Sequence, residues 1–277
     1  MDKIGYLGPK GTFTHDAALI RAREINGHLV EYDSIQELIY AVAEGEVSES
    51  VVPIENAMEG TVNLTIDILV HEVNLNIVKE LVIPIQHCLM ARNGIRLEDI
   101  TKVLSHPQAL AQCRKFLDSC LKNAKRENTQ STAAAALLVR DSELPWAAIA
   151  NFRAADIYGL NILKEGIQDH NGNSTRFVTI SHKEAQRTGW DKTTLAFTVD
   201  HKPGSLFRAL KIFADMNINL TKIESRPMRT LLGQYLFLVD LEGHKDDDVV
   251  KEALGQLYKQ CKFFKLLGSY PRFYSKE

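Results

Sequence analysis

The sequence of 277 residues predicts two domains, an α/β domain followed by a smaller α+β domain. Strand-like and helix-like segments alternate over residues 1–167, whereas the order of segments changes after residue 191. Between these parts, SHKEAQRTGWD at 181–191 is polar and has neither the two-residue period of a strand nor the 3.6-residue period of a helix, which predicts a linker. The charge balance also changes, since residues 1–189 contain 19 Lys and Arg against 24 Asp and Glu, and the remainder contains 14 against 11.

The first part of the chain is typical of βαβ units. The predicted strands are KIGYL (3–7), HLVEY (28–32), SVVPIE (50–55), parts of NIVKELVIPIQHCLMA (76–91), TKVLSH (101–106), WAAIAN (146–151) and TRFVTI (175–180), and the predicted helices are 14–25, 61–70, 107–121 and 131–140. Strands that alternate with helices of about 10–15 residues predict mainly parallel sheets with helices on both faces.

The second part has another order of segments. The strands TTLAFTVD (193–200), INLTKIESRP (218–227), QYLFLVDLEG (234–243) and FFKLLGSY (263–270) enclose two amphipathic helices, SLFRALKIFADM (205–216) and DDVVKEALGQLYKQ (247–260). This βαββαβ order over about 80 residues is the ferredoxin-like plan.

The composition is that of an ordinary globular protein, with 45% hydrophobic and 25% charged residues. A formal net charge of -2 gives no reason to expect nucleic acid or an anionic membrane as partner. No apolar run reaches the roughly 18–20 residues that span a bilayer, and the first residues lack the apolar stretch of a signal peptide. The four cysteines show no metal-ligand spacing, so we expect free thiols and a cytoplasmic location.

Two segments place polar groups where a strand ends. In GYLGPKGTFTHDAA (5–18), Thr12 and Thr14 are available as helix caps, and the segment reads either as a capped turn or as an anion site. In VVPIENAMEGTV (51–62), an apolar strand leads into Glu55, Asn56 and Glu59 before a helix expected near residue 61. The two carboxylates are compatible with acid–base catalysis, but their spacing slightly favours a capped and solvated loop.

Two further segments begin helices with polar residues. In LSHPQALAQC (104–113), Ser105 or His106 caps a helix that starts with Pro107, and a histidine at such a place is often structural. In TQSTAAAALLV (129–139), Ser131 and Thr132 begin an Ala-rich helix. Helix N-termini and neutral donors gathered in one pocket suit a small, multiply charged anion.

Several motifs are absent from the sequence. HEVNL at 71–75 lacks the second His of HExxH, and neither a G-x-S-x-G nor a G-x-G-x-x-G motif occurs. We therefore expect neither a metal site nor a dinucleotide cofactor.

Taken together, the segments GPKGTFTHDAA, VVPIENAMEGTV, LSHPQALAQC, STAAAA and NSTRF resemble, in this order and spacing, the monofunctional bacterial prephenate dehydratases. KPGSLFRAL (202–210) and NLTKIESRP (219–227) resemble the ACT regulatory domain of that family. The resemblance implies conversion of prephenate to phenylpyruvate, water and carbon dioxide without a cofactor. It also implies a two-lobed catalytic domain at 1–183, similar to the type II periplasmic-binding-protein fold, with lobe crossings near 78–86 and 160–170, a linker at 184–191 and an ACT domain at 192–272.

The resemblance also implies roles for single residues. Thr175 matches the catalytic threonine of the TRF motif, where its hydroxyl would hydrogen bond to the departing oxygen. Arg176 could pair with a substrate carboxylate or merely hold the loop. Ala57 stands where many relatives have serine, so position 57 receives no catalytic role. The other expected catalytic residues are Asn56, Ser105 and Gln112, and the expected substrate-binding residues are Thr12, Phe13, Glu55, Glu59, His106, Ser131, Thr132, Arg176 and Phe177.

For the second domain, the resemblance implies phenylalanine as an allosteric inhibitor bound between two ACT domains of a dimer or a dimer of dimers. The residues expected to bind phenylalanine are Gly204, Ser205, Leu206, Asn217, Asn219, Leu220, Glu224 and Ser225. Three alternatives stay open: an ACT domain that only dimerises, a sensor of small anions without catalysis, and a dehydratase that uses arogenate.

Overall fold

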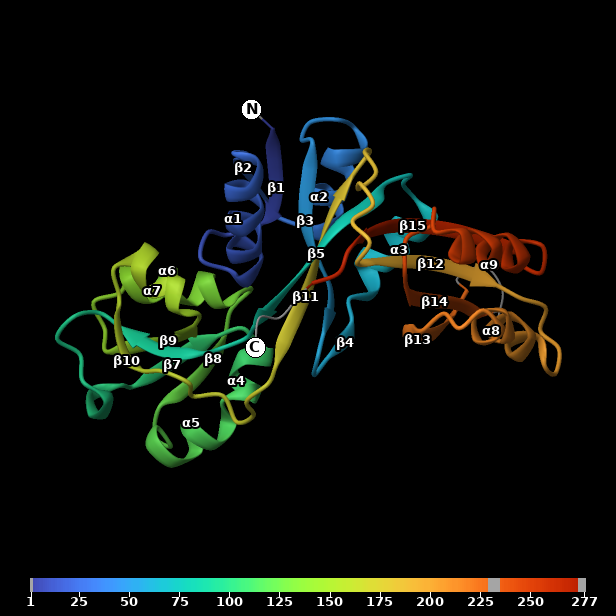
Figure 1. Cartoon of the computed structure of the whole chain (residues 1–277). Coiled ribbons are helices and arrows are strands. Elements are labelled where there is room, and N and C mark those ends of the chain that lie inside the picture. Colours follow the sequence, from blue (N-terminus) through green and yellow to red (C-terminus); the bar gives the residue numbers. More distant parts are fainter. Residues whose placement is uncertain (1, 229–234, 274–277) are drawn as a thin grey trace.

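The computed structural model describes residues 2–228 and 235–273. Three β-sheets lie one after another, each with helices packed against it (Figure 1). The first sheet has the strand order β2-β1-β3-β11-β5, and the short strand β4 pairs with β3. Its elements are β1 Lys3–Leu7, α1 Phe13–Ile25, β2 His28–Tyr32, α2 Ile35–Ala43, β3 Glu49–Asn56, β4 Gly60–Thr61, α3 Asn63–His71, β5 Asn76–Pro84 and β11 Ser174–Ser181.

The second sheet has the strand order β10-β6-β9-β7-β8 and is built from one continuous part of the chain. Its elements are β6 Cys88–Ala91, η1 Leu97–Asp99, β7 Lys102–Ser105, α4 Pro107–Gln112, α5 Arg114–Cys120, β8 Lys125–Asn128, α6 Thr132–Asp141, β9 Trp146–Ala150, α7 Phe152–Tyr158 and β10 Asn161–Lys164. The chain enters this sheet between β5 and β6 and leaves it between β10 and β11. We call the first sheet with its helices lobe I and the second lobe II.

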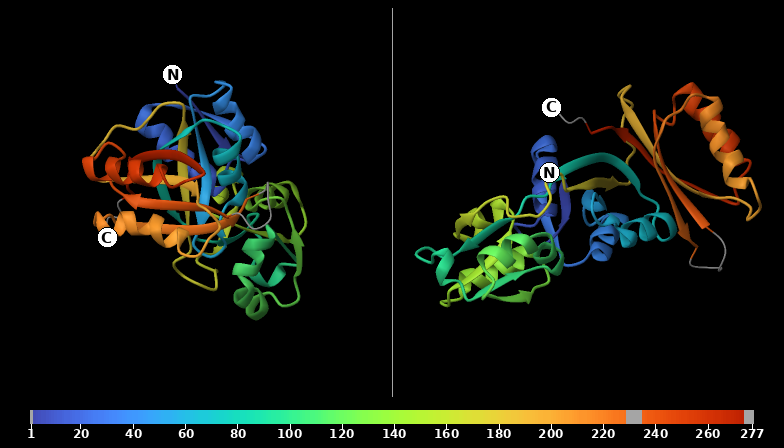
Figure 2. Two further views of the ribbon diagram at one scale, coloured as in Figure 1. Left: turned by 90° about the vertical axis from the view of Figure 1, so that its right-hand side faces the viewer. Right: turned by 90° about the horizontal axis from the view of Figure 1, so that it is seen from below.

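The third sheet is antiparallel throughout, with the order β13-β14-β12-β15. Its elements are β12 Asp191–Thr198, α8 Ser205–Asp215, β13 Leu220–Pro227, β14 Tyr235–Glu242, α9 Asp248–Tyr258 and β15 Phe263–Pro271. Helices α8 and α9 cover the face that points away from lobe I (Figure 2). The predicted fold class, a two-lobed α/β domain followed by a ferredoxin-like α+β domain, is confirmed.

The prediction of mainly parallel sheets is wrong, because both lobes have mixed sheets. β1 is parallel to β2 and β3, and β7 is parallel to β8 and β9. In contrast, β11 is antiparallel to β3 and β5, and β6 is antiparallel to β9 and β10. The antiparallel strands are those that carry the chain between the lobes, and no βαβ connection fixes their direction.

Some boundaries also differ from the prediction. The helix expected at 107–121 is two helices that meet at Cys113, because the Gln112 carbonyl accepts a hydrogen bond from Asp169 N at 2.6 Å. The helix expected near residue 61 begins at Asn63, since Gly60 and Thr61 pair with β3 as β4. Helices α2 and α7 and strands β8 and β10 were not predicted. Residue 234, the first of the predicted strand 234–243, lies outside the described residues.

One hydrophobic cluster joins lobe I to the third sheet. Val52 on β3, Ile77 on β5 and Ile180 on β11 pack in the same buried cluster as Leu238 on β14 and Leu267 on β15. The ACT-like sheet therefore uses the face without helices to cover lobe I. None of the helices in the described ranges 2–228 and 235–273 is long and apolar enough to cross a membrane.

Candidate active site

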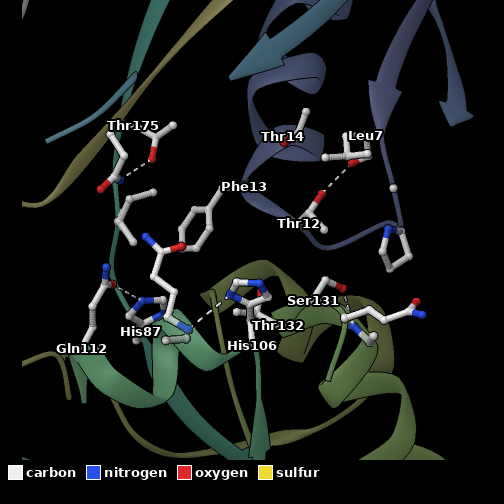
Figure 3. Close-up of a pocket in the computed structure, with 18 of the residues that line it drawn as sticks. Leu7, Thr12, Phe13, Thr14, His87, His106, Gln112, Ser131, Thr132 and Thr175 are labelled. Carbon is white, nitrogen blue, oxygen red and sulfur yellow. Dashed lines mark hydrogen bonds between the residues drawn. The ribbon is translucent and has the colours of Figure 1, made fainter. Parts of the chain in front are cut away.

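A cavity of about 840 Å³ lies between the two lobes. Figure 3 shows Thr12, Phe13 and Thr175 on its lobe I side, with His106, Ser131 and Thr132 opposite them on lobe II. Other lining residues come from the two crossings, namely Ile85, His87 and Asn173. The cavity is thus formed at the place where the chain passes between lobes, and its size is that of a small-molecule site.

Thr175 is held by Asn56 on the neighbouring strand. The two residues are opposite each other in the β11–β3 register, and Asn56 Nδ2 donates to Thr175 Oγ1 at 2.8 Å. The Asn56 amide is itself oriented, because its Oδ1 accepts from Met58 N at 3.0 Å and from Glu59 N at 3.1 Å. Since Asn56 occupies an acceptor position of the Thr175 oxygen, the hydroxyl proton is left to donate to a group in the cavity.

Two longer helices begin at the cavity. Thr12 caps α1 by accepting from His15 N at 3.2 Å, and Ser131 caps α6 by accepting from Ala134 N at 3.0 Å. The first-turn N–H groups of a helix have no partner within that helix and carry partial positive charge. They provide donors for an anion without a cationic side chain. His106 Nδ1 caps the short helix α4 by accepting from Gln108 N.

A buried polar group of three residues, His87, Gln112 and Asn173, forms one wall of the cavity. His87 Nε2 lies 3.0 Å from Gln112 Oε1, and Asn173 Nδ2 donates to the same oxygen at 3.3 Å. His87 is therefore the donor at Nε2, which leaves Nδ1 as an acceptor. Burial lowers the pKa of His87 by more than the hydrogen bond with Gln112 raises it. The pKa therefore lies below its ordinary value, and the ring is neutral at pH 7.

Three atoms of this group have no hydrogen-bond partner in the described structure: His87 Nδ1, Gln112 Nε2 and Asn173 Oδ1. Buried polar atoms without partners are unusual and costly. The three residues line the cavity, but these particular atoms are buried behind its surface.

The charged lining residues are acidic. Glu31 and Asp33 line the cavity, and no Lys or Arg is among the described lining residues. Tyr6 Oη donates to Glu31 at 2.7 Å, and burial followed by this carboxylate raises the pKa of Tyr6 well above its ordinary value. An anionic substrate must therefore be held by neutral donors and helix N-termini. Among the described residues, no group of three or more His, Cys, Asp or Glu side chains is arranged to hold a metal ion.

Eight of the residues expected at the site line the cavity: Thr12, Phe13, Asn56, His106, Gln112, Ser131, Thr132 and Thr175. Their catalytic and binding roles stay predictions. Sequence reasoning missed Glu31, Asp33, His87 and Asn173. The polar pair Gln86 and His87 between the apolar stretches 81–85 and 88–91 was a signal for His87, since it lies between β5 and β6, where the chain crosses to lobe II.

Ser105 does not reach the cavity, contrary to its expected catalytic contact. It is fully buried, and its Oγ donates to the Ile149 carbonyl at 2.6 Å within lobe II. Glu59 is exposed in the turn between β3 and β4 and does not line the cavity. Ser105 is the last residue of β7 and Glu59 follows β3, and the strand pleat in one case and the turn in the other direct these side chains elsewhere.

Glu55, Arg176 and Phe177 also lie outside the cavity, contrary to their expected contact with substrate. Successive strand residues face opposite sides of a sheet, so Glu55 and Arg176 point away from the face that carries Asn56 and Thr175. Glu55 pairs with Lys222 at 2.9 Å on the third sheet. Phe177 is 2% exposed and packs in the core of lobe I.

Comparison with known proteins identifies the family. Residues 4–185 match the family model for prephenate dehydratase, and residues 193–257 match the model for the ACT domain. The chain belongs to the prephenate dehydratase family. A curated relative, the prephenate dehydratase of Lactococcus lactis subsp. cremoris, is 43% identical, and the alignment covers 97% of each chain. The prephenate dehydratase of Bacillus subtilis is 42% identical, covering 97% of this chain and 98% of the relative. The predicted enzyme class, prephenate dehydratase, is therefore confirmed.

Solved structures share the fold of the whole chain. Prephenate dehydratase from Arthrobacter aurescens in complex with L-Phe superimposes with a TM-score of 0.87 at 38% identity, covering 98% of this chain and 90% of the other. The structure of GqqA, described as a novel type of quorum quenching acylase, has a TM-score of 0.86 at 29% identity and covers 98% of both chains.

Six of the eight residues expected to bind phenylalanine form two groups at opposite ends of α8, and the other two, Glu224 and Ser225, lie further along β13. Gly204, Ser205 and Leu206 begin the helix, whereas Asn217 and the residues after it follow its end. Glu224 does not belong to either group, because its carboxylate faces lobe I, where it accepts a hydrogen bond from Thr61 Oγ1 and pairs with Lys222 at 3.4 Å.

Proposed function

We propose that this chain carries out the phenylpyruvate-forming step of phenylalanine biosynthesis, with Thr175 as the donor to the leaving oxygen, and that phenylalanine inhibits it through the ACT domain. The observation that carries the catalytic proposal is the Asn56–Thr175 pair at the cavity. In this pair the Thr175 hydroxyl proton is left free to donate into the cavity, and strand β11 holds the residue in place.

The chemistry requires a donor at the ring hydroxyl. As the carboxylate on the ring leaves as carbon dioxide, its bonding electrons complete the aromatic ring, and the carbon–oxygen bond of the hydroxyl breaks. The departing oxygen leaves as water after it has taken up one proton. A threonine hydroxyl is a weak acid, so Thr175 acts mainly by hydrogen bonding to the oxygen as negative charge develops there. Aromatisation supplies much of the driving force, so a weak donor suffices.

Substrate orientation falls to neutral groups. Prephenate carries two carboxylates, and the N-termini of α1 and α6 are placed to receive them from opposite lobes. Gln112 Nε2, which has no other partner, is a donor near the lobe crossing. Enclosure of the substrate between lobes also excludes water, which strengthens each of these interactions.

The catalytic proposal is tested by Thr175→Ala. We expect kcat to fall by about 10²–10³-fold, while the KM for prephenate changes little, because only a transition-state contact is removed. Thr175→Ser should retain more activity, since the hydroxyl survives. Turnover is measured by the absorbance of the phenylpyruvate enolate in alkali, and near-normal kcat in Thr175→Ala would contradict the assigned role.

The geometry gives no support to acyl transfer, the activity by which the GqqA protein is described. An acylase of the usual kind needs a nucleophile within hydrogen-bond reach of a base. In the part of the chain that the structure describes, Thr175 pairs with an amide, Ser131 caps a helix, and His87 pairs with Gln112. A sensor without catalysis would have no use for the oriented Thr175 hydroxyl. Comparing turnover of prephenate and arogenate tests the choice of substrate.

The geometry of the ACT domain supports a phenylalanine site that is shared between two chains. The two groups at the ends of α8 are separated by 11 helical residues, or about 16 Å, which is too far for one amino acid to contact both in a single chain. Two chains placed side by side can bring the start of α8 in one next to residues 217–220 of the other. We therefore propose an ACT-mediated dimer with phenylalanine between the chains. The four free cysteines are consistent with a reducing cytoplasm.

Inhibition is tested by titrating activity with phenylalanine in wild type and in Asn219→Ala. We expect the inhibitory concentration to rise about tenfold in the variant, with unchanged turnover when phenylalanine is absent. Sedimentation at several protein concentrations checks the dimer. Equal inhibition of both proteins would place the effector site elsewhere.

A further inference from the structure

Arg176 follows Thr175 on β11, but its guanidinium lies on the opposite face of the sheet, between lobe I and the third sheet. Arg176 Nε lies 2.8 Å from Glu80 on β5. Its Nη1 lies 2.6 Å from Asp240 on β14, and its Nη2 donates to Tyr270 Oη on β15 at 2.6 Å. Figure 1 shows β11 at this junction, beside the start of the ACT sheet. One side chain thus bonds to both domains.

The hydrogen bonds around Arg176 form a closed ring. Tyr270 Oη accepts a hydrogen bond from Arg176, so the Tyr270 hydroxyl can donate its own proton to Thr194 Oγ1, 2.5 Å away. Thr194 Oγ1 donates in turn to Asp240 Oδ1 at 2.6 Å. Asp240 in turn accepts from Arg176. Burial raises the pKa of Tyr270 well above its ordinary value, so the phenol stays protonated.

This cluster is buried and balanced in charge. Glu80 is 3% exposed, Asp240 2% and Tyr270 0%. Lys192 Nζ lies 2.8 Å from Glu80, and Glu55, 3.5 Å from Arg176 Nη1, pairs with Lys222, so three carboxylates face three cations. A buried ion pair is often no more stabilising than apolar side chains of the same volume, but its geometry is specific. The cluster therefore fixes how β11 sits against the ACT sheet.

The charge cluster around Arg176 bears on the position of Thr175. The register between β11 and β3 shifts between Arg176 and Phe177, so the ladder on the β3 side is interrupted next to Thr175, whereas the pairing with β5 continues from Ser174 to Thr179. Asn56 holds the Thr175 side chain on the cavity face, and the charge cluster holds the adjoining residue on the other face. Consecutive Cα atoms are about 3.8 Å apart, so a shift of the Arg176 backbone is passed on to Thr175.

We infer that Arg176 is a positioning residue that ties the Thr175 hydroxyl to the ACT sheet, so that a displacement of Asp240 and Tyr270 changes turnover. The regulatory part of this inference rests on the proposed inhibition by phenylalanine. The part that concerns turnover rests on the proposed role of Thr175, which Thr175→Ala tests separately.

Two variants of the full-length protein test the inference. Asp240→Asn weakens the link from the ACT side, far from the substrate. Arg176→Met with Asp240→Asn removes one charge of each sign, so no buried carboxylate loses its only cation and the fold has no new unpaired charge. The control is Lys265→Met, which removes another contact between the domains, from Lys265 Nζ to the carbonyls of Val70 and Val73 at 3.1 and 2.6 Å, without touching β11.

In the absence of phenylalanine, we expect the double variant to lose about tenfold in kcat with a nearly unchanged KM, because misplacing a catalytic group affects the chemical step more than binding. In Asp240→Asn, the phenylalanine concentration for half inhibition should rise about tenfold, while calorimetry shows phenylalanine binding close to that of wild type. Lys265→Met should match wild type in both measurements.

The inference is overturned if both Asp240 variants keep the kcat and the inhibition of wild type, or if Lys265→Met loses as much as they do. If wild type itself is not inhibited by phenylalanine, the proposed regulation fails, and the kcat of the double variant still decides the role of Arg176.

Discussion

Thr175 and Arg176 are neighbours in sequence with opposite surroundings. Thr175 lines the cavity, and Arg176 is enclosed by carboxylates of β5 and β14. The sequence motif does not distinguish the two, since both are polar residues at the start of a strand. Because successive strand residues face opposite sides of the sheet, only Thr175 faces the cavity, and the Arg176 guanidinium lies in the contact between lobe I and the ACT sheet.

His87 gives a prediction for stability against pH. Burial lowers its pKa below the ordinary value of 6.5, so the unfolded chain binds more protons than the folded one as pH falls below about 6.5. The free energy of unfolding should therefore fall across that window, and it should fall less in His87→Gln, which cannot take up a proton. Melting temperatures at about pH 7.5 and pH 5.5 measure this difference. The exposed His28→Gln is the control, and equal pH dependence in wild type and His87→Gln would contradict the prediction.

Much of the cavity lining follows from local rules of sequence. Thr12, Ser131 and His106 were predictable because caps precede helices, and Asn56 because it ends an apolar strand. His87 and Asn173 were not, because they become neighbours of Gln112 only when the two crossings pass side by side. Short-range sequence patterns carry no information on contacts between residues that are far apart in the chain.

At the scale of elements, the helices that face the cavity are positioned by their caps. Ser131→Ala removes the hydrogen bond to Ala134 N, and Ser34→Ala removes the matching bond to Glu37 N at the start of α2, where the preceding Asp33 lines the cavity but Ser34 and the helix do not. Each change should lower the free energy of unfolding by about 1 kcal/mol. Only Ser131→Ala should also raise the KM for prephenate, by about fivefold, because the N-terminus of α6 faces the cavity.

Chemical denaturation and steady-state kinetics of the two cap variants provide the measurement. An equal rise in KM for both variants would mean that the caps act on the fold alone and not on substrate binding.

Element types were easier to predict than strand directions. The β-branched runs and capped Ala-rich helices determine β3, β7, α6 and β11 locally. The direction of β11 depends on where the chain re-enters lobe I after lobe II, which no local pattern encodes. The expectation of mainly parallel sheets failed for this reason.

At the scale of the whole molecule, the close contact of the ACT sheet with lobe I requires a glycine. A Cβ on Gly268 of β15 would lie 2.3 Å from the carbonyl oxygen of Ile77 on β5, and the φ of Gly268 is +149°. Gly268→Ala must push the two sheets apart, so it should lower the free energy of unfolding by about 2 kcal/mol. Gly255→Ala in α9 meets no atom within 4 Å and should raise it by up to about 1 kcal/mol.

Thermal unfolding of the two glycine variants compares these effects. If Gly268→Ala unfolds at the temperature of wild type, the sheets can separate without loss, and the contact between them is weaker than its burial suggests.

The place of β11 between β3 and β5 has a consequence for the growing chain on the ribosome. All of lobe II, residues 88–164, is synthesised before β11, so lobe II can close while lobe I still has an open slot. During that interval, β3 and β5 expose strand edges that other chains can pair with. The strand that fills the slot also brings Thr175. Synthesis of β11 therefore supplies the Thr175 hydroxyl and covers these strand edges at the same time, and a chain that stops before residue 174 has neither.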